Sequence, residues 1–282
     1  MKNLIHFLGL LLCISSIYAQ DKIIEGRITD SLKKPIQYAN IGIANKPIGT
    51  VSDENGMFSF LLENVSESDT LKISCLGFKT KELVLKNLDV NSSKINVSLD
   101  NYIERLDEVT VNKNSLKTYS EGKEKTDTKN QVIFANPNYK NINLGSEIGK
   151  KFSLGDKKPS LLTDFKFFIK DNNFEMVKFR INIYNIQKDR PNIKINQSNI
   201  IVQVDNKLTD WVNVDLSQFD ITVQQDIIIT VEWIEHSKGG DKLNLPIIIP
   251  SFGSTHYYKF GSQGTWQKYG KISSSMVLVY KQ

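Results

Sequence analysis

The chain is rich in residues that suit β-strands and poor in the residue that best suits helices. Its 282 residues include 33 Ile and 17 Val but only 4 Ala. Branched side chains pack well on pleated sheets, whereas Ala has the highest helix propensity. An AT-rich genome would also raise the Ile content, so the argument needs periodicity as well. Several segments alternate apolar and polar residues as half-buried strands do, and together these features predict an all-β fold.

The first 19 residues predict a secretory signal peptide. Lys2 gives a cationic start, an apolar run extends over residues 4–17, and Ala19 is a small residue at the expected cleavage point. The run is shorter than the roughly 20 residues that span a bilayer, so we expect no transmembrane segment in the mature chain. Cys13 follows three Leu residues rather than the small residues of a lipidation site, which argues against a lipid anchor.

Removal of the signal peptide leaves Cys75 as the only thiol, which excludes an intramolecular disulfide. Residues 71–75 alternate like a half-buried strand, so we interpret Cys75 as a packed residue rather than a reactive one.

Charge is mixed along the chain. There are 36 basic and 31 acidic residues, a formal net charge of +5. Nucleic-acid-binding proteins carry a basic patch or stripe, and none is evident here. We therefore expect no nucleic-acid partner.

Residues 20–111 predict a first sandwich of about seven short strands, because strand-like runs and turn signals recur at sandwich spacing. Asn55-Gly56 is the strongest hairpin signal, and Phe58 and Phe60 then share one face of the following strand. The acidic cluster at residues 53–56 could also be read as a Ca²⁺ loop. The twelfth position of such a loop would be Asn64 instead of the required Glu, so a hairpin turn is favoured.

Four pieces of this segment carry a family resemblance. They are Gly26–Asp30, Pro35–Ile41, Gly49–Asp53 with Gly56 and Phe58, and Asp69–Ser74 with Gly77 and Phe78. In this order they resemble the carboxypeptidase regulatory-like domain, a transthyretin-like β-sandwich that is frequent in secreted proteins of Gram-negative bacteria. The resemblance implies a sandwich fold and an accessory module rather than a catalytic one.

Leu106–Val111 resembles the segment that joins this domain to the plug of TonB-dependent outer-membrane receptors. A receptor barrel needs many membrane strands of about ten residues each. The residues after 111 are too few for both a plug and a barrel, which excludes a transporter. We expect the protein to be exported to the periplasm, the outer-membrane periphery or the cell surface of a Gram-negative bacterium.

The rest of the chain predicts a linker and a second sandwich. Residues 112–143 are expected to form a flexible polar linker, because Lys113–Asn130 has almost no large aliphatic residues. Residues 144–282 are expected to form a jelly-roll-like β-sandwich of two layers and eight or more strands. Within it, Trp211 and Trp233 lie in apolar runs and are expected in the core.

No motif places catalytic groups together. The mature chain has only two His, His236 and His256, whereas a zinc hydrolase needs about three protein ligands. Gly261–Gly264 lacks the spacing of a nucleophile elbow. Glu232 and Glu235 flank Trp233, yet strand alternation puts them on opposite faces. We expect no enzyme activity, no metal site and no cofactor.

Aromatic residues of the second sandwich form the candidate ligand-binding site, namely Tyr257, Tyr258, Trp266 and Tyr269. Sugar rings stack on exposed aromatic side chains, although packing in the core or at its rim is the alternative interpretation. We predict a non-enzymatic, exported cell-envelope protein that acts as a binding or scaffolding module with an envelope protein partner. The alternative function is carbohydrate binding, with a surface glycan held by the C-terminal sandwich, and a hydrolase is the third hypothesis.

Overall fold

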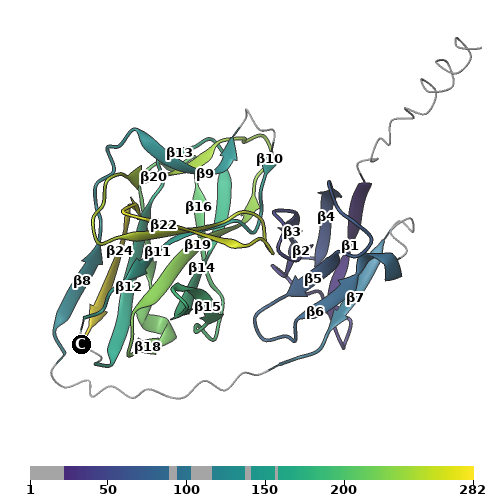
Figure 1. Ribbon diagram of the computed structural model, residues 1–282, viewed down its shortest axis with the longest axis horizontal. Helices are drawn as coiled ribbons and strands as arrows, with labels where there is room; N and C mark the ends of the chain where they lie inside the picture. The colour runs from purple at the N-terminus through teal and green to yellow at the C-terminus, as the bar shows by residue number, and fades with distance from the viewer. Residues whose placement is uncertain (1–21, 89–93, 103–115, 137–140, 156–157) are drawn as a thin grey trace, which may run out of the picture.

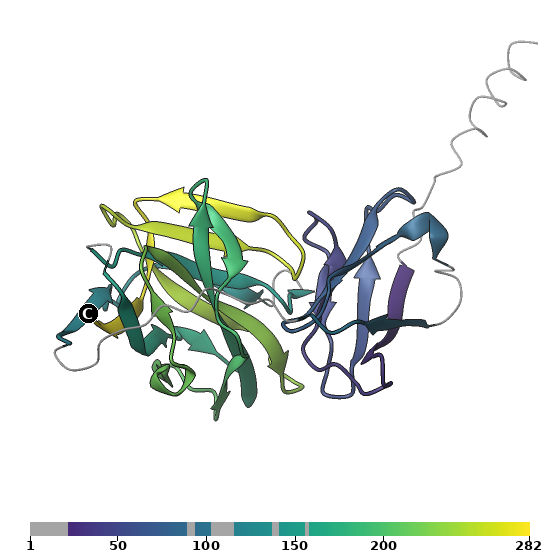
Figure 2. The ribbon, with the colours of Figure 1, turned by 90° about the horizontal axis from the view of Figure 1, so that it is seen from below.

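The computed structural model describes residues 22–88, 94–102, 116–136, 141–155 and 158–282, which form two β-sandwiches side by side (Figure 1, Figure 2). The predicted signal peptide, residues 1–19, lies outside the described residues. Within the described ranges, no helix is long and apolar enough to cross a membrane. The all-β prediction is confirmed, because the helices described there are the short 3₁₀ turns η1 (Leu85–Asn87) and η4 (Ser217–Phe219).

The N-terminal sandwich consists of two sheets built from strands β1 to β7. One sheet has the order β4-β1-β7, with β1 (Lys22–Asp30), β4 (Met57–Leu62) and β7 (Ile95–Leu99). The other has the order β3-β2-β5-β6, with β2 (Asn40–Ile43), β3 (Gly49–Val51), β5 (Thr70–Ser74) and β6 (Lys81–Val84). Aliphatic residues of both sheets, such as Ile28, Ile41 and Ile73, share one core.

The turn predicted at residues 53–56 lies between β3 and β4, but the prediction that it closes a hairpin is wrong, because β3 pairs with β2 in one sheet and β4 pairs with β1 in the other. The Asp53 carboxylate accepts the backbone N–H of Asn55 and of Met57, each at 2.8 Å. Gly56 has a φ of 72°, a conformation that favours glycine. The acidic side chain of the suspected Ca²⁺ loop therefore closes a turn.

The C-terminal sandwich consists of three sheets that share one hydrophobic core. The largest has the order β15-β14-β19-β11-β21-β22 with β16 on β14, comprising β11 (Glu147–Phe152), β14 (Met176–Gln187), β15 (Arg190–Lys194), β16 (Ile200–Asp205), β19 (Ile227–His236), β21 (Thr255–Lys259) and β22 (Trp266–Gly270). The second has the order β17-β12-β24-β8 with β18 on β12, comprising β8 (Thr118–Gly122), β12 (Ser160–Phe168), β17 (Trp211–Asp215), β18 (Thr222–Val223) and β24 (Met276–Lys281). The third has the order β10-β9-β20-β13 with β23 on β20, comprising β9 (Asn130–Asn136), β10 (Asn141–Ile142), β13 (Asp171–Asn172), β20 (Leu243–Ile248) and β23 (Ser273–Ser274).

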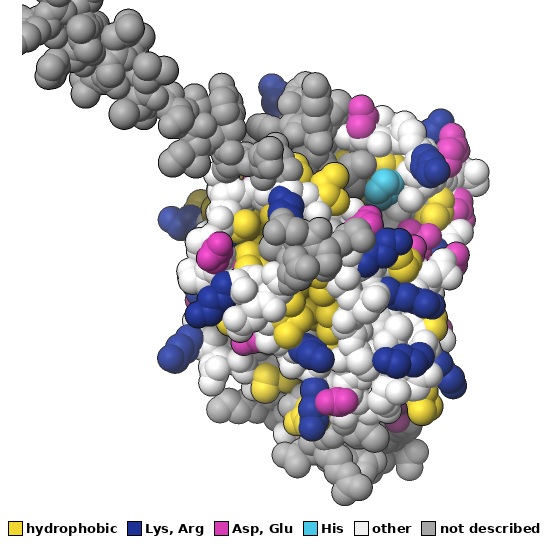
Figure 3. Space-filling view, turned by 90° about the vertical axis from the view of Figure 1, so that its right-hand side faces the viewer, with side chains coloured by type: hydrophobic (Ala, Val, Ile, Leu, Met, Phe, Trp, Pro, Cys, Tyr) yellow, Lys and Arg dark blue, Asp and Glu magenta, His cyan; other side chains and the backbone are white. Residues whose placement is uncertain are grey.

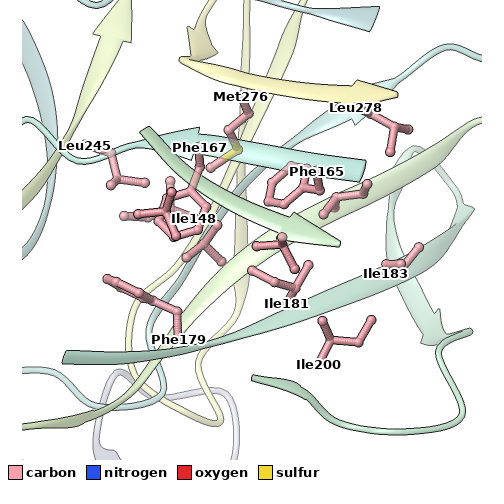
Figure 4. Packing of buried hydrophobic residues seen from close by; sticks show 14 of the residues in the cluster. Ile148, Phe165, Phe167, Phe179, Ile181, Ile183, Ile200, Leu245, Met276 and Leu278 are labelled. Carbon is pink, nitrogen blue, oxygen red and sulfur yellow. The ribbon is translucent and has the colours of Figure 1, made fainter. Parts of the chain in front are cut away.

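The core of this sandwich follows the predicted alternation. Phe165 and Phe167 of β12 and Phe179 of β14 are fully buried, and their side chains converge between the sheets (Figure 4). Phe167 and Phe179 meet edge to face, with ring centroids 5.3 Å apart. Trp233 is also fully buried, as predicted, whereas Trp211 is only half-buried and lies beneath the Lys166 ammonium.

The prediction of a flexible polar linker over residues 112–143 is wrong where the structure forms strands, and residues 112–115 and 137–140 lie outside the described residues. Residues 118–122 form β8, which pairs with β24, and residues 130–136 form β9, which pairs with β20. The polar side chains of β8 stay largely exposed while its backbone completes a sheet, so strand formation here needs little apolar burial. β9 and β10 also form part of the third sheet, together with β13, β20 and β23.

The molecular surface carries both signs of charge. Figure 3 looks from the side of the N-terminal sandwich, where basic and acidic side chains are interspersed among hydrophobic ones. Ile23 of β1 and Leu61 of β4 are cross-strand partners and both are exposed.

Candidate functional site

The two sandwiches meet where β14 and β19 face β2 and the residues before it. Arg180 of β14 and Glu232 of β19 are register partners, and their side chains are only 2% and 0% exposed. Arg180 Nη1 donates to the Tyr38 carbonyl at 2.8 Å, and Nη2 donates to the side-chain oxygen of Asn40. Asn40 Nδ2 in turn donates to Glu232 Oε1 at 2.5 Å. A buried ion pair of the C-terminal sandwich thus binds the N-terminal sandwich directly.

The Glu232 carboxylate is surrounded by donors. Arg180 Nε and Nη2 donate to its two oxygens, each at 2.9 Å, and Asn182 Nδ2 donates to Oε2 at 2.7 Å. Burial alone would raise the pKa of Glu232, but Arg180 and Lys194 outweigh it and hold the pKa well below its ordinary value. Glu232 therefore stays ionised at neutral pH and does not hold a proton that it could transfer.

A second buried carboxylate, Glu147 of β11, adjoins this pair. It accepts hydrogen bonds from Lys259 Nζ at 2.5 Å, Thr230 Oγ1 at 2.6 Å and Tyr184 Oη at 2.9 Å. Asn182 donates to Glu147 as well, at 3.1 Å, and so bridges the two carboxylates. Burial, followed by the charge of Glu147, raises the pKa of Tyr184 well above its ordinary value, so its hydroxyl remains a donor.

A β-bulge in β19 brings Glu235 to the same face as Glu232. The register of β14 against β19 shifts between these two residues, which leaves Ile234 unpaired. Glu235 then pairs with Lys178 and Glu232 with Arg180, two residues that share one face of β14. The prediction that the two Glu side chains lie on opposite faces is therefore wrong, because a bulge interrupts the alternation on which it rested.

Tyr38 makes the second contact between the sandwiches. Its hydroxyl donates to Glu235 Oε2 at 2.5 Å and accepts from Lys178 Nζ at 3.2 Å, while its ring packs with Val51 and Ile234. The backbone of Tyr38 has a φ of 57°, which bulky residues rarely adopt. Contacts to the other sandwich through its ring, hydroxyl and carbonyl stabilise this conformation.

Tyr38→Phe is expected to lower the free energy of unfolding by about 1–2 kcal/mol, because it removes a hydrogen bond to a charged group at a partly buried site. Urea unfolding measured beside Tyr119→Phe checks this. Tyr119 is exposed, and its hydroxyl has no hydrogen-bond partner among the described residues, so that variant should match the wild type. An equal effect of both substitutions would contradict the interface contact.

The loop between β21 and β22 makes the third contact. Ser262 Oγ donates to the Ile41 carbonyl at 2.6 Å, and Gln263 Nε2 donates to the Asn40 carbonyl at 3.2 Å and to Ser74 Oγ at 2.9 Å. Gly49 provides the space for this approach, since a Cβ there would lie 2.6 Å from Ser262 Oγ. Direct hydrogen bonds at three places therefore hold the sandwiches together.

Beside these contacts the sandwiches enclose a cleft of about 390 Å³. The N-terminal wall is formed by Asn40, residues 74–78 and Tyr102, and the C-terminal wall by Arg180, Lys194, Asn196 and Gln197. Lys194 Nζ lies 3.8 Å from Glu232 Oε2. Burial lowers the pKa of the Lys194 ammonium, and the charge of Glu232 opposes that shift. The cleft thus combines two cationic side chains with neutral polar and apolar ones.

Cys75 lies on the N-terminal wall of this cleft, just after β5, and is half-buried. Burial raises the pKa of its thiol. Because the thiolate is the nucleophile, this environment supports the prediction of a packed rather than a reactive cysteine.

The four aromatic residues predicted as a ligand site do not form one platform. Register pairing puts Tyr257 and Trp266 on one face of the β21–β22 hairpin and Tyr258 and Tyr269 on the other. Tyr257 is fully buried, Tyr258 packs against the core, and Trp266 packs edge to face on Tyr184. Of the four, Tyr269 is the one that is largely exposed, at 45%.

The two histidines lie apart from the cleft. His236 packs against the rings of Phe174 and Trp233, and His256 is buried with Nδ1 3.0 Å from Ser274 Oγ. In the part of the chain that the structure describes, neither imidazole hydrogen-bonds a carboxylate or a thiol. No group of three or more His, Cys, Asp or Glu residues in the described ranges is placed to hold a metal ion.

Comparison with known families identifies the first sandwich. Residues 24–111 match the family model of the CarboxypepD_reg-like domain. The matched segment includes β2 to β7 and all of β1 except its first two residues, so the family resemblance carried by the four sequence pieces is confirmed for this part of the chain. A search of curated proteins gave no match.

Several solved structures share weak similarity with the chain. One is a DUF3823 family protein from Parabacteroides merdae, with 11% identity and a TM-score of 0.21, covering 76% of this chain and 98% of that one. Another is a structure of infectious bursal disease virus, with 9% identity and a TM-score of 0.27, covering 86% and 52%. A third is the major pilin subunit of Bacillus cereus, with 10% identity and a TM-score of 0.20, covering 90% and 69%.

Sequence reasoning missed the charged residues of this site. Alternation in the sequence puts Arg180 and Asn182 on the side of their strand opposite Phe179 and Ile181, and Lys194 was not singled out. The structure confirms that Arg180 and Asn182 lie on that side of the strand. This side faces the N-terminal sandwich rather than water.

Proposed function

We propose that this protein is a non-enzymatic, exported component of the cell envelope that binds a partner in the cleft between its two sandwiches. The observation that carries the proposal is the double role of Arg180. Its guanidinium hydrogen-bonds Glu232 within its own sandwich and Tyr38 and Asn40 of the other, and the same side chain lines the cleft. A site between two bodies keeps its shape only if the bodies are held in place. The buried hydrogen bonds beside the cleft meet that requirement.

The proposal of a binding rather than catalytic role rests on how the ionisable groups are used. A general acid or base needs a pKa near the working pH and access to the substrate. Glu232 and Glu147 are buried and each is occupied by several donors. His256 is buried, and its pKa is lowered to about 4 by that burial. These groups are suited to hold the fold together.

Export and an envelope location rest on two features. Residues 1–19 have the pattern of a secretory signal peptide. Residues 24–111 match a domain whose relatives, by the resemblance noted above, stand in secreted and outer-membrane proteins of Gram-negative bacteria. An envelope protein or a surface glycan is the partner class that this location offers.

Photo-crosslinking in cells tests the proposal. A photoreactive phenylalanine analogue replaces Gln197, an exposed residue of the cleft, and in a matched strain it replaces Lys207, an exposed residue that does not line it. We expect one defined adduct from position 197 and none from position 207. Fractionation and N-terminal sequencing should find the chain, shortened by residues 1–19, in the periplasm or outer membrane.

Three results would contradict the proposal: no adduct from either position, equal adducts from both, or an uncleaved chain in the cytoplasm. The mass of the adduct also separates a protein partner from a glycan. Turnover of a peptide or glycan substrate that is abolished by changing His256 or Glu232 would refute the non-enzymatic part of the proposal.

A further inference from the structure

We infer that the cleft binds a small ligand bearing one carboxylate, with Lys194 as the residue that holds it. This inference rests on the proposed function and names the chemical class of the ligand. It follows from the position of Lys194, from the charge balance of the buried groups and from the composition of the cleft walls.

The N–H groups of the Lys194 ammonium are not engaged by the neighbouring carboxylate. Its contact with Glu232 Oε2 is 3.8 Å, beyond hydrogen-bond distance, and that oxygen already accepts from Arg180 Nε and Asn182 Nδ2. Among the described residues, Lys194 Nζ forms no hydrogen bond; its other contact is with the Tyr184 ring, whose centroid lies 5.8 Å away. The side chain is 30% exposed and lines the cleft, so its N–H groups are available to a ligand there.

The buried charges around Lys194 do not balance. We define the buried charge network as Arg180, Lys259, Glu147 and Glu232 together with Lys194, whose side chain is partly exposed at the edge of the network; ion pairs join Arg180 and Lys194 to Glu232, and Lys259 to Glu147. It contains three cations and two carboxylates, a formal excess of one positive charge. Removing an uncompensated charge from water is costly, and an anion placed next to it offsets that cost. A single carboxylate matches this excess, whereas a phosphate dianion would exceed it.

The other walls of the cleft suit an organic acid. No Asp or Glu is among the described residues that line it, and the Glu232 carboxylate behind Lys194 is paired with Arg180. Leu76, Phe78 and Tyr102 provide apolar and aromatic surface for the body of a ligand, and Gln197 offers an amide. A volume of about 390 Å³ is within the usual range for small-molecule sites. Sugar acids and the C-terminus of a peptide share this chemistry.

Calorimetric titration of the full mature chain with four probes tests the inference. It also distinguishes a sugar acid from a peptide C-terminus as the source of the carboxylate. Galacturonate and its uncharged methyl ester represent sugars, and N-acetylphenylalanine and its amide represent a peptide terminus. We expect at least one acid to bind about tenfold more tightly than its uncharged counterpart. Lys194→Gln should abolish that preference and Lys194→Arg should retain it, while Lys207→Gln, on an exposed residue outside the cleft, should leave it unchanged.

Lys194→Gln should fold, because Arg180 still pairs with Glu232 in its absence. If this variant does not fold, the affinities of the wild type for each acid and for its uncharged counterpart still test whether the cleft prefers a carboxylate. Equal binding of charged and uncharged probes, no binding of any of the four, or an undiminished preference in Lys194→Gln overturns the inference. A specific crosslink at position 197 together with any of these results would leave the proposed function standing and remove only the ligand class.

Discussion

Arg180→Met is expected to lower the free energy of unfolding by about 3–5 kcal/mol, because it leaves a buried carboxylate without its partner. The Arg180 guanidinium donates two charge-assisted hydrogen bonds to the Glu232 carboxylate, each at 2.9 Å. It also supplies two of the contacts to the N-terminal sandwich, at Tyr38 and Asn40. The same substitution therefore weakens the C-terminal sandwich and its junction with the other one.

Scanning calorimetry measures both effects. Arg180→Met should lower the transition temperature and separate the unfolding of the two sandwiches into distinguishable transitions. The matched control is Lys207→Met, which removes an ion pair with Glu175 whose side chains are 52% and 64% exposed. Exposed pairs contribute about 0–1 kcal/mol, so the control should stay close to the wild type. Equal losses in the two variants would show that the buried charge network does not carry the stability assigned to it.

The strands of the C-terminal core could be predicted because alternation is a local property. Phe165, Phe167 and Ile169 are spaced two residues apart in the sequence, which puts them on one face of a strand, and all three are buried. Whichever sheet covers that face, every second residue of a strand points towards it. The estimate of about seven strands for the N-terminal sandwich is also confirmed, because turn signals separate its strand-like runs.

The strands within the predicted linker could not be predicted from alternation. For β8 the reason is that backbone hydrogen bonds, rather than apolar burial, stabilise the strand. Thr118–Gly122 is polar, yet it pairs along β24 and satisfies its N–H and C=O groups there. Phe134 of β9 is fully buried against Phe179 and Trp233. The apolar run over residues 132–135 is only four residues long and shows no alternation, so periodicity gives it no clear assignment.

The candidate site could not be predicted because it depends on contacts between distant segments. Periodicity assigns Arg180 to a polar face but does not tell whether that face meets water or another sandwich. The bulge at Ile234, which puts Glu232 and Glu235 on one side, has no residue signature in the sequence. The aromatic site was proposed from residue type alone, and strand pairing divides it between two faces.

His256 is expected to make the protein less stable in mild acid. It lies in β21 with 2% of its surface exposed, and burial lowers its pKa to about 4 from the ordinary value of 6.5. Between these two values the unfolded chain binds a proton that the folded chain does not. The free energy of unfolding therefore falls as the pH decreases from about 6.5 to about 4, by about 3 kcal/mol in total. Above pH 6.5 this contribution is fully retained.

His256→Gln isolates this effect, because both proteins keep the carboxylates that also titrate near the acidic end of the range. Urea unfolding at pH 7 and at pH 4 should show a larger loss in the wild type than in the variant, by about 3 kcal/mol. The comparison uses the difference between the two pH values, so any constant cost of replacing the ring cancels. An NMR titration of the imidazole provides an independent measurement. A pKa near 6.5, or equal losses in the two proteins, would mean that His256 is accessible to protons in the folded state, and that the sheet formed by β11, β21 and β22 opens more readily than its buried histidine indicates.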